Sequence, residues 1–485
     1  MSSQPSSSPT ADMASAPAAE PPAQPMADAQ HGSLRSRAKR GTAIFAVSQI
    51  IGQLMRLGSN LLLTRLLVPE HFGIMALVNI YISGINMFSD LGIRQSIVQN
   101  KLGDDQRFLN TAWTVQVIRG FAVWLIACIL AFPIAYGVYD LPILAQLLPV
   151  AALASVALGF QSTKASTASR HLLLGREMSI QLGCNVIGIA VMAAIAYYYQ
   201  TVWSLVIGGV VNATLKSALT HVVFPGPNNR FAWDRESLGE LIRFGKWVFM
   251  GTVVVFVANN VDRLALSKLI TTEMLGIYQI AFMLSNLPSM LIKRFGNDVV
   301  FPIVSRQAEQ SRESIRQKLL KNQRKLALLM SMPVLLLVCG GDVVVELLWD
   351  DRYREAGWMT SILGLGMWIG MLYSTSQPAL MALGKPQYGM FLNLARVIWV
   401  GLVAWAGFHY FGLIGFLVAF GLSELPAYLV VAYATTREKI AMWRQDVWMT
   451  ALMLLAVGAV VMIRYSLTGD IPFLPDSERF GMLGV

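Results

Sequence analysis

The sequence is dominated by apolar stretches that are long enough to cross a bilayer. A helix needs about 20 apolar residues to span roughly 30 Å of hydrocarbon. About thirteen stretches reach this length: 42–64, 73–90, 113–138, 143–160, 180–199, 202–224, 247–268, 275–292, 327–347, 357–382, 388–410, 412–434 and 447–464. With 55% hydrophobic and 14% charged residues, the chain cannot be an ordinary soluble multidomain protein. Backbone polar groups in lipid must be satisfied internally, so we predict an all-α polytopic membrane protein with about 13 transmembrane helices.

A fourteen-residue segment recurs halfway along the chain. Residues 61–74 (LLLTRLLVPEHFGI) match residues 264–277 (LALSKLITTEMLGI) at an offset of 203 (276 − 73), and six positions are identical. Two leucine-rich helices followed by a turn could match by chance. Both copies open one half of the chain, however, which favours two related lobes with a site where they meet.

The positions of Lys and Arg predict the topology. They gather in the N-terminal region and the even-numbered loops, whereas odd-numbered loops such as 140–142 and 409–410 hold few. By the positive-inside rule the N-terminus and even loops are cytoplasmic. The two repeat copies then start on the same side, giving six-helix lobes related by a parallel pseudo-two-fold axis along the membrane normal. This distribution also explains the net charge of +10, and we expect no nucleic-acid partner.

These features divide the chain into five parts. We predict a disordered cytoplasmic tail (1–36), an N-lobe with helices one to six (37–224), a cytoplasmic linker rich in Pro and Gly (225–240), a C-lobe with helices seven to twelve (241–436), and an extra transmembrane helix with a C-terminal tail (437–485).

Four short segments of the sequence resemble those of a known family. Residues 63–73 (LTRLLVPEHFG) and 89–95 (SDLGIRQ) in the first half, and 260–264 (NVDRL) and 275–278 (LGIY) in the second, are similar to bacterial polysaccharide transporters of the oligosaccharide flippase family, within the multidrug/oligosaccharidyl-lipid/polysaccharide exporter superfamily. The resemblance covers roughly residues 38 to 436. It implies two six-helix lobes around a central cavity, with inward-open and outward-open states.

The resemblance also implies a function. Such a protein moves undecaprenyl-pyrophosphate-linked oligosaccharide repeat units, for exopolysaccharide, capsule or O-antigen, from the cytoplasmic to the periplasmic leaflet of the bacterial inner membrane. Its partners would be the polyprenyl-pyrophosphate-linked oligosaccharide, membrane lipids, and a polysaccharide polymerase with its export machinery; we expect a monomer. Many members add a pair of helices after the twelve, whereas this chain has one clear span there, residues 447–464.

Charged residues inside apolar stretches are the candidate site, because a charge at mid-bilayer costs at least about 2.5–3.5 kcal/mol. Five are cations: Arg56, Arg119, Lys216, Arg263 and Arg396. The acids are fewer: Asp262, Glu424 and, near a span end, Asp90. A positive excess suits a pyrophosphate, which Arg binds through paired hydrogen bonds. Position 60 is the repeat equivalent of Arg263 (263 − 203) and lies one helical turn from Arg56. We therefore expect Arg56 and Arg263 both to face the cavity.

Each candidate has a structural alternative. Arg263 could pair with an acid on another helix, and Arg119 and Lys216 could fasten helices within a lobe. Asn60, Asn259 and Asn260 could bind sugar hydroxyls or make hydrogen bonds between helices. Asp90 and Arg94, at i and i+4, are expected to form a helix-end ion pair that could latch the cytoplasmic gate.

Signatures of enzymes and cofactor sites are absent from the sequence. It has no phosphate-binding GxxxxGK[ST] loop, no HExxH and no CxxC pair, so we expect a transporter without cofactor or metal. Two rivals remain: a cation-coupled multidrug exporter of the same fold, which would need an intramembrane acidic site, and a membrane glycan polymerase or ligase, which would need a large periplasmic loop.

Overall fold

The structure is a computed structural model that describes residues 47–100, 102–171, 174–295, 300, 304, 311–468 and 473, and the tail expected at 1–36 lies outside these residues. All regular elements in the described part are helices. The first helix covers residues 47–66. The others are α2 (Pro69–Phe88), α3 (Ile93–Gln99), α4 (Gln106–Phe132), η1 (Pro133–Val138), α5 (Leu144–Gly159), α6 (Lys164–Arg170), α7 (Leu174–Tyr199), α8 (Trp203–Val223), α9 (Arg235–Leu269), α10 (Thr272–Phe295), α12 (Arg312–Leu348), η3 (Asp351–Tyr353), α13 (Ala356–Tyr373), α14 (Ser376–Ala382), α15 (Gln387–Trp399), η4 (Val400–Ala404), α16 (Trp405–Gly421), α17 (Glu424–Arg437) and α18 (Trp443–Thr468).

The all-α membrane class is confirmed, while the number of spans stays a prediction. Each of the thirteen apolar stretches coincides with one or more helices. In the described residues, eight helices are long and apolar enough to cross a membrane, or nine if the bent pair α5 and α6 counts as one span. One of the eight, residues 387–437, reverses direction at Gly412 (φ 61°), so that Trp399 donates to the carbonyl of Ala419. That segment therefore contains two antiparallel helices.

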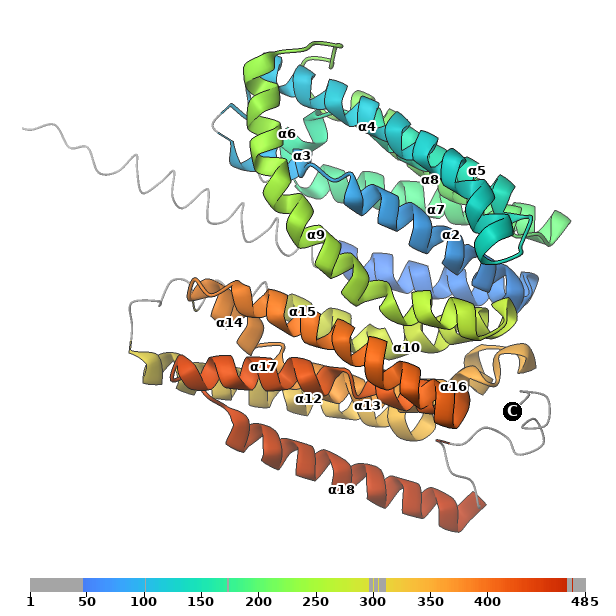
Figure 1. Ribbon diagram of the computed structural model, residues 1–485, viewed down its shortest axis with the longest axis vertical. Helices are drawn as coiled ribbons and strands as arrows, with labels where there is room; N and C mark the ends of the chain where they lie inside the picture. Colours follow the sequence, from blue (N-terminus) through green and yellow to red (C-terminus); the bar gives the residue numbers. More distant parts are fainter. Residues whose placement is uncertain are drawn as a thin grey trace, which may run out of the picture.

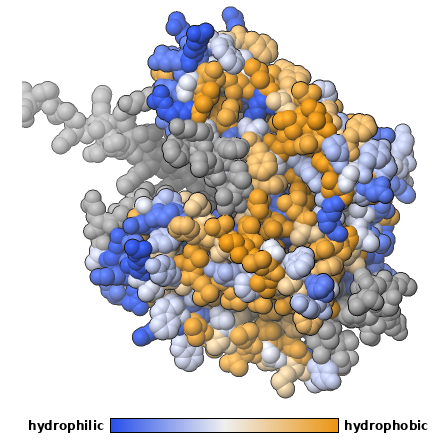
Figure 2. Space-filling model, in the orientation of Figure 1, coloured by the Kyte–Doolittle hydropathy of each residue, from blue (hydrophilic) through white to orange (hydrophobic). Residues whose placement is uncertain are grey.

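The helices form two groups (Figure 1). The first helix and α2 to α8 make up one, in which α4 packs on α5, α5 on α8, and α7 on α8. The other contains α10 and α12 to α18, in which α12 packs on α13, α13 on α16, and α15 on α17. We call the first group the N-lobe and the second, together with the later turns of α9 (Arg235–Leu269), the C-lobe; the predicted domain boundaries stay a prediction. In the view of Figure 2 an apolar band crosses both groups, with hydrophilic residues to either side, as expected of a surface that meets lipid.

Helix α9 runs from one lobe to the other. It begins at the N-cap Asp234, whose carboxylate accepts a hydrogen bond from the backbone N–H of Ser237 at 2.8 Å. Its first turns pack on the N-lobe, where Leu241 is buried in a cluster with Ile97 and Phe108. Its later turns contact α10 and α15 of the C-lobe. The helix therefore continues without a break across the division expected at residue 240.

The two repeat copies meet each other where the lobes join. A Cβ atom on Gly73 would overlap the carbonyl oxygen of Thr272, and one on Gly276 would overlap that of Pro69. Thr272 and Gly276 are the repeat equivalents of Pro69 and Gly73 at the offset of 203, so the contact is reciprocal. A two-fold axis between α2 and α10 would produce this reciprocity. Glycine is required here because the two backbones approach too closely for a side chain.

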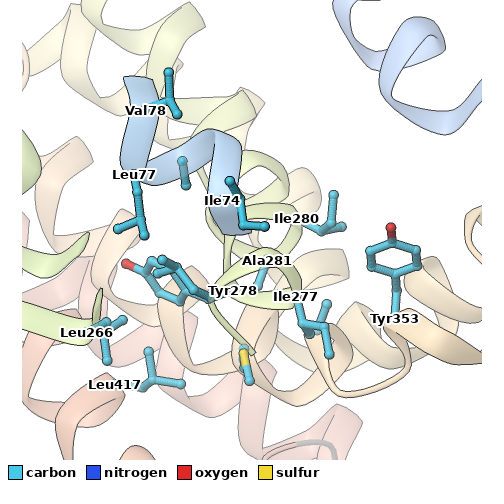
Figure 3. Packing of buried hydrophobic residues seen from close by; sticks show 14 of the residues in the cluster. Ile74, Leu77, Val78, Leu266, Ile277, Tyr278, Ile280, Ala281, Tyr353 and Leu417 are labelled. Carbon is cyan, nitrogen blue, oxygen red and sulfur yellow. The ribbon is translucent and has the colours of Figure 1, made fainter. Parts of the chain in front are cut away.

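An apolar core surrounds this glycine contact. Figure 3 shows Ile74 and Leu77 of α2 beside Ile277 and Tyr278 of α10, and all four are buried. Tyr353, from the loop before α13, packs into the same core and makes an edge-on ring contact with Phe72. We call the reciprocal glycine pair and this surrounding core the interlobe contact. It lies at the odd-loop end of the helices.

Candidate functional site: an interlobe cavity and two lobe pockets

A cavity of about 860 Å³ lies between the lobes. Its walls come from the first helix, α2, α7 and α8 on one side and from α9 and α10 on the other. The polar residues among its lining are Gln53, Arg56, Ser59, Asn60, Asn79, Asn259, Arg263, Gln279, Asn286 and Ser289. So many polar side chains would be costly if they faced lipid. Their gathering here therefore distinguishes the cavity surface from the lipid-facing sides of the same helices.

Helical spacing brings these side chains to the cavity. Arg56 and Asn60 are four residues apart on the first helix, and Asn259 and Arg263 have the same spacing on α9. Residues at i and i+4 lie on one face of a helix, so each helix turns a narrow polar face to the cavity. The four predicted residues Arg56, Asn60, Asn259 and Arg263 are thus brought together by the fold.

Arg263 has no carboxylate partner among the described residues. Its guanidinium lies over the ring of Phe282, 4.1 Å from the centroid, and donates to Oδ1 of Asn260 at 3.3 Å. Its Nε is buried without a hydrogen-bond partner, as is Oδ1 of Asn60 across the same cavity. Asn260 does not line the cavity but supports Arg263. A buried donor and acceptor left open in one cavity are suited to a polar ligand.

Arg56 is also free of acidic partners in the described part of the chain. The residue is exposed and lines the cavity, and it forms no ion pair with a carboxylate among the described residues. Two unpaired guanidinium groups therefore line one cavity from opposite lobes. This combination offers positive charge and several N–H donors to an anion.

A second pocket of about 460 Å³ lies inside the C-lobe and contains Asp262, Arg396 and Glu424. Arg396 and Glu424 form an ion pair at 2.9 Å, and the hydroxyl of Tyr373 donates to the same carboxylate. Asp262 accepts from the hydroxyl of Tyr278 rather than pairing with its neighbour Arg263. These charges are held by partners on other helices, which lowers the cost of burying them.

A third pocket, of about 350 Å³, lies in the N-lobe and contains Asp90, Arg94 and Arg119. Arg119 donates to the carbonyl of Asn86 at 2.8 Å and lies 3.8 Å from Asp90. Arg94 pairs with Glu177 at 2.8 Å. The predicted Asp90–Arg94 pair is therefore wrong.

The reason for that error is a break in the helix. Gly92 has a left-handed backbone (φ 59°) between the end of α2 and the start of α3. The i, i+4 geometry of a continuous helix does not apply across such a break. Asp90 instead accepts from the backbone N–H of Gly92 at 3.0 Å.

Lys216 lines none of these three cavities. It lies on α8, and its ammonium group donates to the side-chain oxygen of Gln181 on the neighbouring α7. This contact corresponds to the structural alternative, in which the lysine fastens two helices of one lobe.

Sequence reasoning missed several polar lining residues. They are Asn79, Gln279 and Asn286 in the interlobe cavity and Tyr373, Gln377 and Asn393 in the C-lobe pocket. Gln279 and Asn286 are seven residues apart on α10, a spacing that places both on one helix face. Uncharged amides at such spacing inside apolar stretches are the signal that could have identified them.

Two C-lobe cations bind N-lobe backbone at the odd-loop end. Arg352 donates to the carbonyls of Thr64, at 2.9 Å, and Leu67, at 3.4 Å, at the end of the first helix. Lys268 donates to the carbonyl of Val138 and lies over the Tyr139 ring. The last carbonyls of a helix lack partners within the helix and attract cations. These contacts therefore hold the lobes together beside the interlobe contact.

We call the contacts of Arg352 and Lys268 with the N-lobe backbone the latch. Arg352 also lowers the pKa of a neighbouring acid, Asp350. Asp350 lies in the loop between α12 and α13, and Arg352 bonds its carboxylate. That hydrogen bond, more than any other effect, holds the pKa of Asp350 below its usual range. The carboxylate therefore stays ionised and orients the arginine toward the first helix.

Known proteins resemble the chain in sequence and in structure. The family described as "Polysaccharide biosynthesis protein" matches residues 62–357. The teichuronic acid biosynthesis protein TuaB of Bacillus subtilis (strain 168) is 21% identical over 321 residues, 65% of this chain and 65% of TuaB. The lipopolysaccharide biosynthesis protein WzxC of Escherichia coli (strain K12) is 21% identical over 351 residues, 71% of this chain and 69% of WzxC. The chain thus spans slightly less than two thirds of TuaB.

Solved transporters share the fold. The lipid II flippase MurJ in an inward closed conformation has a TM-score of 0.67 at 14% identity and covers 91% of this chain and 95% of its own. An inward-facing multidrug resistance MATE family transporter has a TM-score of 0.61 at 12% identity, with 82% and 98% covered. At these identities the likeness concerns the fold alone. Because the family match covers more than half of the 485 residues, the chain belongs to the polysaccharide biosynthesis protein family.

Proposed function

We propose that the protein is a flippase that moves polyprenyl-pyrophosphate-linked oligosaccharides across the bacterial inner membrane. The observation that carries this proposal is the pair of arginines, Arg56 and Arg263, that line the interlobe cavity from opposite lobes without carboxylate partners among the described residues. Family membership and the two curated biosynthesis relatives support a lipid-linked glycan as the cargo.

The cavity chemistry fits each part of such a ligand. Arg56 and Arg263 would hold the pyrophosphate through charge-assisted hydrogen bonds, with Arg263 already oriented by Phe282 and Asn260. The amides of Asn60 and Asn259 would bind hydroxyl groups next to it. The polyprenyl chain would remain in lipid, because leaving it there avoids exposing apolar surface to water.

The interlobe contact supports a direction of access. The lobes are joined at the odd-loop end by Gly73, Gly276 and Arg352. If these contacts separated and the lobes approached each other at the even-loop end, the cavity would face the odd-loop side. The charge distribution predicts that side to be periplasmic. We further propose a cytoplasmic N-terminus, a monomeric state, and a polysaccharide polymerase with export machinery as partners.

The positive excess in the cavity argues against a cation-coupled multidrug exporter. Asp262 and Glu424, the acids of the C-lobe pocket, are already engaged by Tyr278, Tyr373 and Arg396. A cationic drug in the interlobe cavity would face two unpaired arginines, and like charges repel.

The test measures lipid-linked glycan in the outer leaflet of the inner membrane in a deletion strain. We expect wild-type protein to restore it, and Arg56→Ala and Arg263→Ala to lower it at least about ten-fold at equal protein abundance, because each removes charge-assisted bonds. Arg176→Ala, an exposed arginine outside the cavity, is the matched control. Unchanged outer-leaflet glycan in the deletion strain itself would contradict the proposal.

A further inference from the structure

The C-lobe pocket adjoins the interlobe cavity. Four residues line both spaces: Asn259, Phe282, Asn286 and Ser289. Phe282 carries the guanidinium of Arg263 on its ring, so the pocket begins beside the group that would hold the pyrophosphate. The consecutive residues Asp262 and Arg263 face different spaces, the acid lining the pocket and the arginine the cavity. A ligand held at Arg263 would therefore lie beside the C-lobe pocket.

Several polar groups in this pocket lack partners. Gln377 and Asn259 make no side-chain hydrogen bond in the part of the chain that the structure describes. Asn393 donates its amide to the carbonyl of Gly389 at 3.0 Å, which leaves its Oδ1 as an acceptor. Nε of Arg396 is buried without an acceptor. The Arg396 Nε is buried, so leaving it open is costly, whereas Gln377 and Asn393 are half-buried and Asn259 is exposed, so their amides are accessible to a polar ligand.

The chemistry of the pocket favours a neutral ligand that has many hydroxyl groups. Arg396 and Glu424 pair at 2.9 Å and offset each other, and the third charge, Asp262, accepts from the Tyr278 hydroxyl, so the lining offers an anion no unpaired cation among the described residues. The remaining amides both donate and accept, as sugar hydroxyls do. Phe282, Tyr373 and Phe420 add aromatic surface that can cover the apolar face of a sugar ring. Its volume of about 460 Å³ lies in the usual range of small-ligand sites.

We propose that the C-lobe pocket is the subsite for the sugar next to the pyrophosphate, and that Gln377 and Asn393 hydrogen-bond its hydroxyl groups. This inference rests on the proposed function, because it places the next part of the same ligand. Arg396, Glu424 and Tyr373 act as the frame that fixes the shape of the subsite. The N-lobe pocket shares no lining residue with the interlobe cavity, so the sugar is recognised by one lobe only.

The experiment uses the full-length protein in lipid nanodiscs and four probes. They are undecaprenyl pyrophosphate itself and undecaprenyl pyrophosphate bearing glucose, galactose or N-acetylglucosamine. For wild-type protein we expect at least one sugar-bearing probe to bind more tightly than the bare lipid. Gln377→Ala and Asn393→Ala should remove about three- to ten-fold of that affinity, the usual effect of losing one hydrogen bond, and leave bare-lipid binding unchanged.

Two further variants separate the possible outcomes. Arg263→Ala should weaken all four probes, and Gln387→Ala, an exposed amide on the same helix as Asn393, should change none. Unaltered melting temperatures establish that the variants are folded. Equal binding of bare and sugar-bearing lipids by wild-type protein, or sugar binding unchanged in both amide variants, overturns the subsite and leaves the flippase proposal standing. Failure of all four probes to bind overturns both.

Discussion

The interlobe cavity and the interlobe contact belong to the same interface between the lobes but are built in opposite ways. Within the part of the chain that the structure describes, Arg56 and Arg263 lack carboxylate partners in the cavity, and two buried polar atoms there, Nε of Arg263 and Oδ1 of Asn60, have no hydrogen bond. In the contact, the glycine pair and its core are closely packed, and the cations beside it, Lys268 and Arg352, bind backbone carbonyls.

This difference separates two roles. Close packing and cation–carbonyl bonds stabilise the closed odd-loop end, where the Tyr353 hydroxyl is buried without a partner among the described residues. The cavity instead keeps two guanidinium groups without carboxylate partners in the described part of the chain, a cost that the proposed ligand would offset. Polar groups that bind and release cargo must leave hydrogen-bonding capacity unused when the cargo is absent. Substitutions should therefore affect folding at the packed and paired positions and ligand handling at the cavity positions.

The largest expected effect on stability concerns a paired arginine. Arg396→Met would leave Glu424 buried with its hydroxyl partner alone and lower the free energy of unfolding by about 3 kcal/mol. Arg263→Met should lower it by less than about 1 kcal/mol, since only a ring contact and one hydrogen bond are lost. Denaturant titration of the detergent-solubilised protein measures both. The double variant Arg396→Met, Glu424→Gln should recover most of the stability lost in Arg396→Met. Equal destabilisation by Arg396→Met and Arg263→Met would contradict the distinction between paired and unpaired arginines.

The next largest effect concerns the interlobe contact. Gly276→Ala places a methyl group against the carbonyl of Pro69 and should cost about 2 kcal/mol through overpacking. Because strain can be relieved by moving the lobes apart, a cysteine placed at Leu77 should become more reactive toward a water-soluble maleimide. Gly58→Ala is the control, since a Cβ there meets no atom within 4 Å. An unchanged melting temperature and an unchanged cysteine reactivity would show that the two backbones do not pack as closely as described.

A smaller effect is expected at the latch beside that contact. Arg352→Met removes the donor to the carbonyls of Thr64 and Leu67 and should cost about 1 kcal/mol, because the side chain is partly exposed and its bonds are screened. The loss should favour the state open at the odd-loop end, which double electron–electron resonance between spin labels on the two lobes can detect. Arg354→Met, on an exposed arginine two residues away, provides the comparison. A distance distribution identical to that of the wild type would remove Arg352 from the latch.

The smallest effect is a dependence on pH. The hydrogen bond from Arg352 lowers the pKa of Asp350 in the folded protein, so its contribution to stability is present above the ordinary value of 3.8 and is lost as pH falls through the lower folded pKa. Since Asp350 is partly exposed, we expect a loss of well under about 1 kcal/mol. Melting temperatures of wild-type and Asp350→Asn protein should differ near pH 7 and converge below about pH 4. Parallel curves across this range would contradict the assignment.

The polar residues of the site illustrate how far sequence reasoning reaches. Arg56 and Asn60, and likewise Asn259 and Arg263, are four residues apart and so share one helix face, and the repeat offset places Arg263 one helical turn from the equivalent of Arg56. Asp90 and Arg94 obeyed the same spacing rule, yet the left-handed Gly92 interrupts the helix between them. A local rule holds only while the local structure continues.

By itself the sequence determined the helical membrane class, the polar faces of the helices and the recurrence of one segment in both halves, because hydrophobic length, helical period and internal similarity are local properties of the chain. The pairing of charges was decided only by the tertiary structure. Arg94 bonds Glu177, 83 residues away, and Arg396 bonds Glu424 on another helix. Such partners depend on which helices pack together, and the same packing left Arg56 and Arg263 without a carboxylate partner among the described residues, on the two sides of the interlobe cavity.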